Sequence, residues 1–452
     1  MSSTAAQLFE RINSRRARVG VVGLGYVGLP LLTEFARSGY TTVGIDLDAR
    51  KVTAINARQS YIPDVPSADV AEMVNAGRMT ATSDFSVVAN LDTVNICVPT
   101  PLRKTKDPDM SYIVSAVEAI ADHLHPGMLI VLESTTYPGT TEELVQPLLE
   151  RGGLRAGIDF FLAFSPERVD PGNGVYTTRN VPKVVGGLTA DCSRLAGALY
   201  SSAIDRVVMV NSPRVAEMVK LLENTFRAVN IGLVNEIALM CEKLGIDVWE
   251  VVDAAKTKPF GFMPFYPGPG LGGHCIPIDP FYLSWKAKQT GFEPRFIELA
   301  GAVNSAMPHA VVDTIADALN LHKRSLNGSR VLIAGLTYKR DIDDIRESPS
   351  LDVMSILQGK GAKLSYVDPH VPTLAARQWA GGYDLASVPA TRATFGATDC
   401  IVILTDHHAF DYQVMIDASP LIVDTRNAIK QRYPHVFRIG ASNAHCVAPV
   451  PG

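Results

Sequence analysis

The 452-residue sequence predicts an α/β protein with two doubly wound domains joined by a helical middle segment. Near both ends of the chain, short apolar runs alternate with amphipathic helical stretches, a pattern typical of Rossmann-like domains with parallel sheets. Between them the pattern changes to long helices without strands. The predicted domains are 1–212, 213–325 and 326–452.

Composition excludes several classes of partner. Hydrophobic residues make up 47% and charged residues 19%, and the formal net charge is −4. Neither nucleic acid nor a membrane is an expected partner, because the net charge is slightly negative and no apolar run is long enough to span a bilayer. The six cysteines contain no CxxC spacing. We therefore expect no metal site and a reducing, cytoplasmic location.

The first predicted strand, 19–22, leads into the glycine-rich stretch GLGYVG and then a helix. A second strand, 42–45, ends at an acid. This context is typical of a dinucleotide-binding loop, where glycines let the pyrophosphate approach a helix N-terminus. The acid would bind the adenosine ribose and repel the 2′-phosphate of NADP, which favours NAD; the alternative is a plain strand–helix turn. The residues predicted here to bind NAD are Gly23, Gly25, Tyr26, Val27, Gly28 and Asp46.

Further strand-like runs at 93–98, 129–132, 160–164 and 183–185 continue the first sheet. Ligands of such sheets bind beyond the carboxyl ends of the strands. The residues that follow the strand ends are therefore site candidates, although an acid there could also lie in a surface turn. These candidates include Thr100, Thr135 and Glu167.

In the helical middle, Lys220 and Asn224 are four residues apart and share one helix face. Neighbouring apolar residues, Phe226 among them, are expected in the core, whereas the lysine and asparagine could simply be solvated. A later helix, 293–322, is expected to be kinked or broken at Pro308.

A glycine-rich loop surrounds one cysteine in GPGLGGHCIPIDP, residues 268–280. Cys275 could be a nucleophile there if its pKa is lowered, with His274 and Asp279 nearby; the alternative is a tight turn with an incidental buried thiol. The preceding segment 259–267, PFGFMPFYP, reads as an ordered binding loop.

The last domain begins after Asn327-Gly328-Ser329, with predicted strands at 331–334, 363–367, 401–404 and 421–423. It lacks GxGxxG, so it would hold a nucleotide differently from the first domain. Basic residues after strand ends suit a diphosphate. They are Lys339, Arg340, Arg346 and Arg426.

The ordered motifs GLGYVG, CVPTP, ESTTYPGTT, FSPE, VKLLENTF, GPGLGGHC and LTYKRDIDDIRESP resemble the UDP-glucose/GDP-mannose dehydrogenase family over nearly the whole chain. PFYPGPGLGGHCIPIDPFYL is most similar to the branch that oxidises UDP-N-acetylglucosamine. The resemblance implies an NAD domain, a helical middle used in dimerisation, a UDP-binding C-terminal domain, and oxidation of a sugar C6 alcohol to a carboxylate. It also suggests supply of polysaccharide precursors.

The resemblance also implies residue roles. Cys275 would be the nucleophile, Lys220 and Asn224 would hold an oxyanion, Glu167 would serve in acid–base work, and Asp279 would orient a water. The implied substrate-binding residues are Glu167, Lys220, Asn224, Tyr266, Gly270 and Lys339, and the further cofactor-binding residues are Thr100, Thr135 and Arg346.

Taking an alcohol to an acid removes four electrons, so two NAD molecules are needed, and a thiolate can retain the aldehyde between the steps. The expected product is a UDP-uronic acid made by a homodimer or higher homo-oligomer. Alternatives are UDP-glucose or UDP-N-acetylmannosamine as the substrate, a two-electron hydroxyacid-type dehydrogenase, and a nucleotide-sugar sensor without turnover.

Overall fold

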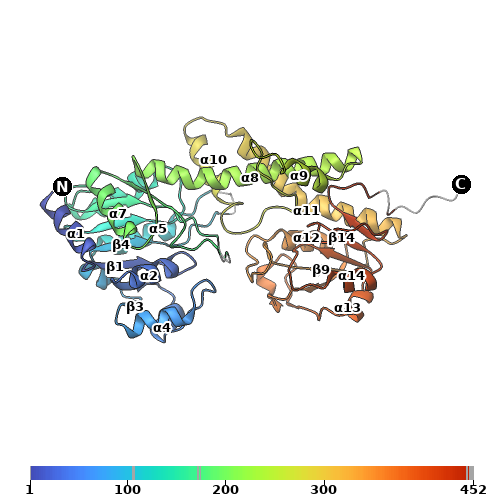
Figure 1. The fold of residues 1–452 in the computed structure, drawn as a ribbon, viewed down its shortest axis with the longest axis horizontal. Coiled ribbons are helices and arrows are strands. Elements are labelled where there is room, and N and C mark those ends of the chain that lie inside the picture. The colour runs from blue at the N-terminus through green and yellow to red at the C-terminus, as the bar shows by residue number, and fades with distance from the viewer. Residues whose placement is uncertain (1, 104–106, 171–172, 174, 444–445, 447–452) are drawn as a thin grey trace. The chain divides into compact units, whose positions relative to one another are not determined.

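The computed structural model describes residues 2–103, 107–170, 173, 175–443 and 446 (Figure 1). The chain forms two compact units. The first comprises Met1–Glu223 and Phe281–Phe292, and the second comprises Asn224–Pro280 and Glu293–Gly452. The three-part division at 212 and 325 stays a prediction.

The sheet of the first unit has the strand order β3-β2-β1-β4-β5-β6-β7-β8. Neighbouring strands from β3 to β6 are parallel, as predicted, but β7 runs antiparallel to β6, with Ala163 opposite Gly187. A wholly parallel sheet is wrong there, because the described residues between β6 and β7 include no helical crossover to return the chain. The strands are β1 (Arg18–Val22), β2 (Thr41–Ile45), β3 (Met79–Thr82), β4 (Thr93–Ile96), β5 (Leu129–Leu132), β6 (Phe161–Phe164), β7 (Lys183–Gly187) and β8 (Val207–Val210).

Helices cover both faces of this sheet, as the doubly wound fold requires. Side-chain caps begin three of them: Ser2 accepts from Ala5 N, Asp48 from Arg50 N and Thr189 from Cys192 N. The helices are α1 (Ser3–Asn13), α2 (Gly28–Arg37), α3 (Ala49–Asn56), α4 (Ser67–Asn75), α5 (Ser111–Ala121), α6 (Gln146–Leu149) and α7 (Ala190–Ser201), with short turns η1 (Phe85–Asn90), η2 (Thr141–Val145) and η3 (Glu150–Gly152).

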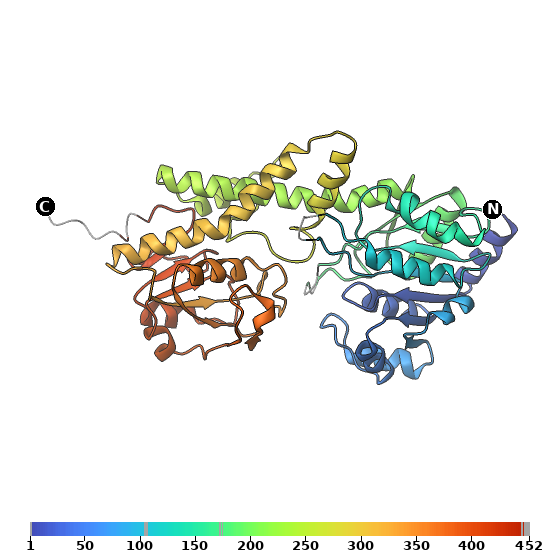
Figure 2. The same cartoon turned by 180° about the vertical axis from the view of Figure 1, so that it is seen from behind.

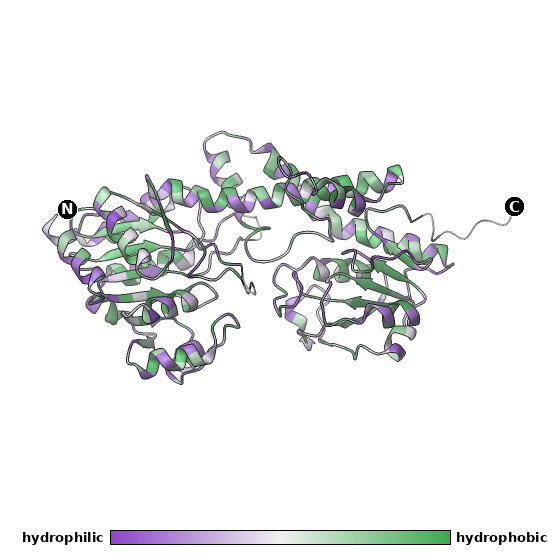
Figure 3. Cartoon of the chain, in the orientation of Figure 1, coloured by the Kyte–Doolittle hydropathy of each residue, from purple (hydrophilic) through white to green (hydrophobic). Residues whose placement is uncertain are grey.

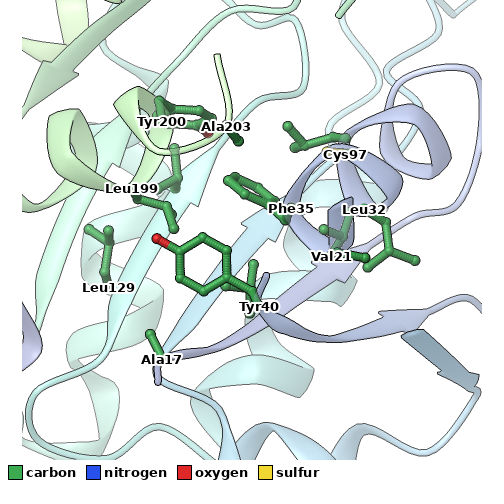
Figure 4. Close-up of a cluster of buried hydrophobic side chains, with 14 of the residues drawn as sticks. Ala17, Val21, Leu32, Phe35, Tyr40, Cys97, Leu129, Leu199, Tyr200 and Ala203 are labelled. Carbon is green, nitrogen blue, oxygen red and sulfur yellow. The ribbon is translucent and has the colours of Figure 1, made fainter. Parts of the chain in front are cut away.

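The core of the first unit lies in two layers, one on each face of the sheet. Val21 belongs to the layer under α1, α2 and α7, whereas Val22 belongs to the layer under α5. Successive strand side chains point to opposite faces, which explains the split. In the first layer, the ring of Phe35 lies 6.1 Å from that of Tyr40 and 6.0 Å from that of Tyr200 (Figure 4).

The second unit holds a parallel sheet in the order β10-β9-β13-β14-β15. The predicted second Rossmann-like domain is therefore confirmed, and Figure 2 shows α11 lying along it. The elements are β9 (Arg330–Ala334), α12 (Pro349–Gly359), β10 (Lys363–Val367), β11 (Thr373–Leu374), η4 (Ala376–Gln378), β12 (Leu385–Ala386), α13 (Arg392–Gly396), β13 (Cys400–Ile403), α14 (Tyr412–Ala418), β14 (Ile422–Asp424) and β15 (Val436–Arg438).

The helical middle contains α8 (Pro213–Leu244), α9 (Val248–Ala255), α10 (Asp279–Gln289) and α11 (Arg295–Leu321). A break at Pro308 is wrong, because α11 continues through this buried proline, whereas the alternative of a kink there stays a prediction. Helix α9 is fixed to β15, since Trp249 donates to Ile439 O and Arg438 to Asp247.

Hydropathy agrees with this arrangement. Figure 3 shows predominantly hydrophobic strands in both sheets, whereas the helices carry hydrophobic and hydrophilic stretches. Within the described part of the chain, no helix is long and apolar enough to cross a membrane.

Candidate active site

The glycine-rich loop after β1 has the backbone geometry of a dinucleotide site. Gly23 has φ +89°, which favours glycine. A Cβ on Gly28 would lie 1.8 Å from Gly23 O, so only glycine lets α2 approach the loop this closely. A Cβ on Gly25 would meet nothing within 4 Å. The first and third glycines therefore make the turn and the packing, and the second leaves space for a pyrophosphate.

The start of α2 completes this cradle. Val27 occupies the N-cap and makes no side-chain capping hydrogen bond. Its apolar side chain leaves backbone N–H groups at the helix N-terminus for an anionic ligand. Half-buried Tyr26 lies in the same loop. These features fit the pyrophosphate of NAD.

The acid at the end of β2 is held in place by two donors. Asp46 Oδ2 accepts from Leu24 N at 2.8 Å and from Lys51 Nζ at 2.9 Å. The carboxylate thus lies beside the glycine loop, where an adenosine ribose binds in this fold. Sequence reasoning missed Lys51, since an isolated surface lysine carries no pattern.

The loops after β4 and β5 carry the next two cofactor candidates. Thr100 O accepts a hydrogen bond from Tyr282 OH at 2.9 Å, which anchors α10 to this loop. Thr135 is half-buried, whereas the neighbouring Thr136 Oγ1 is buried and has no hydrogen-bond partner. Both loops follow carboxyl ends of parallel strands, as predicted.

Glu167 follows β6 and is tightly held. Its Oε1 accepts from the N–H groups of Arg168 and Val169, each at 2.7 Å, and its Oε2 accepts from Lys183 Nζ at 3.2 Å. Burial acts to raise the pKa of Glu167, but the charges of Lys183 and Lys220 and the two backbone donors bring that pKa below its usual value. This acid is therefore a fixed, ionised carboxylate rather than a solvated surface group.

Lys220 reaches this region because the part of α8 up to Glu223 belongs to the first unit. Buried Glu217 accepts from Gly139 N at 2.5 Å and Thr141 N at 2.9 Å, and Glu223 pairs with Arg168. The alternative that Lys220 is solvated is wrong, since the residue is 8% exposed. Sequence reasoning missed Glu217, and it wrongly predicted a core position for Phe226, which is 46% exposed.

The cysteine loop forms a hydrogen-bonded turn that starts α10. The N–H groups of Ile278 and Asp279 donate to Cys275 O, and Asn224 Nδ2 donates to Asp279 Oδ2. Cys275 is half-buried, whereas Asn224 and Asp279 are buried. His274 is exposed at the surface, but partial desolvation and the charge of Arg346 lower its pKa, which favours a neutral imidazole next to the cysteine in sequence.

Glycines let this loop pack tightly on the segment after β9. A Cβ on Gly272 would lie 2.5 Å from Tyr338 Cβ, and one on Gly273 would lie 2.8 Å from the Tyr338 ring. Gly270 has φ +139° and lies against Pro349. The close approach of the loop backbone to Tyr338 and Pro349 therefore explains why glycine occupies these positions.

Tyr266, an expected substrate residue, is packed against α9. Its ring stacks on Trp249 with centroids 6.1 Å apart, and its hydroxyl donates to Asp253 at 3.0 Å. Other apolar side chains of the same loop stay exposed, notably Phe260 and Met263. A role for Tyr266 in substrate binding stays a prediction.

The strand order of the second sheet reverses between β9 and β13, because the chain goes from β9 to β10 on one side and later to β13 on the other. Parallel sheets bind ligands at such a switch point. Lys339 follows β9 there, and Arg340 pairs with Asp406 of the neighbouring strand end. Arg346 makes a bidentate contact with Asp344, at 2.9 and 2.6 Å. Arg426 donates to Leu404 O at 2.8 Å.

A polar cluster adjoins this edge. Potential metal-ligand atoms of Asp341, His370 and His407 lie within 4.8 Å of one another. The imidazole of His407 is already engaged, with Nδ1 accepting from Asp341 N and Nε2 lying 3.2 Å from an Asp368 oxygen. These contacts make it part of a hydrogen-bonded cluster.

The predicted catalytic residues are distributed over both units. Glu167 and Lys220 belong to the first unit, and Asn224, Cys275 and Asp279 to the second. The structure brings Glu167 near Lys220 and Asn224 onto Asp279. Joint action of the five stays a prediction.

Comparison with known proteins places the chain among nucleotide-sugar enzymes. Models of the UDP-glucose/GDP-mannose dehydrogenase family match it in the NAD-binding domain (17–204), the central domain (214–306) and the UDP-binding domain (332–431). It is 36% identical to a UDP-N-acetyl-D-glucosamine 6-dehydrogenase of Pseudomonas aeruginosa, over 87% of this chain and 91% of the relative. It is 35% identical to a UDP-N-acetyl-D-mannosamine dehydrogenase of Pyrococcus horikoshii, over 92% and 96%. A solved structure of UDP-D-ManNAc dehydrogenase from Pyrococcus horikoshii matches with TM-score 0.86 and 33% identity, covering 94% of this chain and 100% of that one.

Proposed function

This chain belongs to the UDP-glucose/GDP-mannose dehydrogenase family and is an NAD-dependent UDP-sugar dehydrogenase, and we propose that it oxidises the C6 alcohol of UDP-N-acetylglucosamine to the uronic acid. The observation that carries the choice of sugar is the similarity, over 87% and 92% of the chain, to relatives named for 2-acetamido sugars. Exposed Phe260, Phe262 and Met263, in the loop before Cys275, support it, because an acetamido methyl could contact such side chains.

The residues of the chain supply the groups that this reaction needs. NAD provides the hydride acceptor for both oxidations. Cys275 Sγ would bond to the aldehyde carbon and so retain it, while Lys220 and Asn224 stabilise the resulting oxyanion. After the second oxidation, Glu167 would take a proton from the water that attacks the thioester, and Sγ would leave as thiolate. Losing one oxyanion donor should slow turnover about 100- to 1000-fold.

The test is NADH formation measured by absorbance with UDP-N-acetylglucosamine, UDP-N-acetylmannosamine, UDP-glucose and a hydroxyacid. We expect kcat/KM to favour UDP-N-acetylglucosamine over UDP-glucose by about 10- to 200-fold, the range of one small apolar contact. With limiting sugar, two NADH should form per sugar. A ratio of one would contradict the thioester route, and a preference for UDP-N-acetylmannosamine or UDP-glucose would replace the proposed sugar.

A homodimer through α8 is part of the proposal. Large apolar side chains recur on this helix at helical spacing and stay exposed, which marks a contact surface. Leu222→Asp and Leu233→Asp should shift the sedimentation coefficient to that of a monomer, and Ile158→Asp, an equally exposed control, should not. The exposed residues are Val215, Met218, Leu222, Phe226, Leu233, Met240 and Leu244.

We further propose a cytoplasmic location and a role in polysaccharide precursor supply. None of the six cysteines, all of which lie in the described part of the chain, forms a disulfide, which suits a reducing compartment. Fractionation of cells should find the protein with cytoplasmic markers.

A further inference from the structure

A buried ionic network lies behind Glu167. Lys183 Nζ lies 2.5 Å from Glu133 Oε2 and 3.2 Å from Glu167 Oε2. The side chains of Lys183 and Glu133 are 5% and 0% exposed. The hydroxyl of Tyr200, from α7, donates to the other oxygen of Glu133.

The antiparallel strand β7 makes this network possible. Its first residue is Lys183, and its register with β6 pairs Phe164 with Gly186 and Ala163 with Gly187. Continued by three residues, the same register sets Lys183 opposite Glu167. A parallel β7 would instead put its first residue at the far edge of the sheet. The antiparallel direction of β7, which the sequence did not predict, thus places the ammonium of Lys183 beside Glu167.

Two carboxylates share this one ammonium, and their surroundings differ. Burial is the largest influence on Glu133 and raises its pKa, although Lys183 opposes this. For Glu167, two backbone N–H donors and Lys183 outweigh burial, so its pKa is lowered. The two environments therefore shift the pKa values of Glu133 and Glu167 in opposite directions, as in sites where one acid must stay ionised.

Resting on the proposed acid–base role of Glu167, we propose that Lys183 is a positioning residue for that reaction, anchored by Glu133 and Tyr200, which keeps the Glu167 carboxylate ionised and fixed in orientation. Stability alone does not explain this buried ion pair, since apolar side chains of similar size often stabilise a folded protein as much as a buried ion pair does. The titratable and charged groups that act on Glu167 or share its network are Lys183, Glu133, Lys220, Cys97 and Tyr200. Arg168 contributes its backbone N–H, and its guanidinium pairs with Glu223.

The test is the pH dependence of kcat, whose acid limb reports a base that must be ionised. Lys183→Met removes the cation, so the acid limb should move up by about 1 to 3 pH units, the shift expected of an adjacent opposite charge. Glu133→Gln removes the competing carboxylate, so the limb should move down. A structural defect would lower activity without opposite shifts.

The matched control is Lys286→Met, which breaks an ion pair of the same length, 2.5 Å to Glu143, in the same unit. It should leave the acid limb unchanged. If Lys183→Met does not fold, Glu133→Gln alone must still shift the limb downward, and an unshifted limb overturns the inference.

Glu167→Gln distinguishes a failure of the proposed acid–base role of Glu167 from a failure of the proposed role of Lys183. If it abolishes turnover while neither network variant shifts the acid limb, the role of Lys183 is overturned and the proposed function stands. If Glu167→Gln retains wild-type turnover, the acid–base role falls, and the inference about Lys183 falls with it.

Discussion

Cofactor choice depends on one carboxylate and one lysine at the end of β2. Asp46 lies 2.9 Å from Lys51, and its side chain is 10% exposed. The 2′-phosphate of NADP would meet the carboxylate first. At about 4 Å and an effective dielectric near 20, two unit charges repel by about 4 kcal/mol.

Screening and the opposing charge of Lys51 reduce this repulsion. A net penalty of about 2 to 4 kcal/mol corresponds to roughly a 30- to 1000-fold preference for NAD. Asp46→Asn keeps an oxygen for the Leu24 N–H but removes the charge, and it leaves Lys51 to attract the phosphate. The NAD/NADP ratio of kcat/KM should therefore fall by on the order of 100-fold.

The assay is initial-rate NADH or NADPH formation at fixed UDP-sugar, with thermal unfolding as the check on folding. The double variant Asp46→Asn with Lys51→Ala should lose most of the gained NADP activity, because no cation remains there. Equal use of both cofactors by the wild type, or an unchanged ratio in Asp46→Asn, would refute this reasoning.

Three further outcomes follow from single positions. Cys275→Ala should block the second oxidation, so that no uronic acid and at most one NADH per sugar form, and two NADH per sugar at a near-normal rate would exclude a covalent route. Gly28→Ala should lose NAD binding and stability, since its methyl would lie 1.8 Å from a backbone oxygen, whereas Gly152→Ala, with open space, should not. A hydrogen bond from Arg330 lowers the pKa of Asp399 to about 2, so its contribution to stability should be lost as pH falls from about 4 to 2. Unfolding midpoints of Asp399→Asn should change less over that window.

The fold was largely predictable because its patterns are local. Apolar runs marked most strands of both sheets, and GLGYVG marked the turn before α2. The antiparallel direction of β7 was not predictable, because a strand's direction depends on how the chain returns to the sheet. The residues of the strand itself do not indicate that direction. The continuity of α11 through Pro308 likewise reflects its buried position in the helix, which overrides a local preference.

The chemical type of several site residues was predictable from the sequence, but the side chains that they contact were not. Glu167 was visible as an acid after a strand, whereas Lys183, which pairs with it, begins another strand and carries no motif. In the same way, Asn224 was predicted as an oxyanion group, and the structure adds that its amide donates to Asp279. Side-chain partners distant in sequence are set by packing, so only the structure gives them.

The basic residues of the second unit show how partners change an interpretation. The sequence predicts Arg340, Arg346 and Arg426 as basic residues suited to a diphosphate, and the family resemblance assigns Arg346 to the cofactor phosphates. Arg340 and Arg346 are each paired with an acid of their own, so binding a diphosphate would require exchanging that partner. Arg426 instead uses Nε for a backbone carbonyl, and a Cβ on Gly268 would lie 2.6 Å from its Nη1. Its guanidinium therefore lies directly against the start of the cysteine loop, and a role for it in binding a diphosphate stays a prediction.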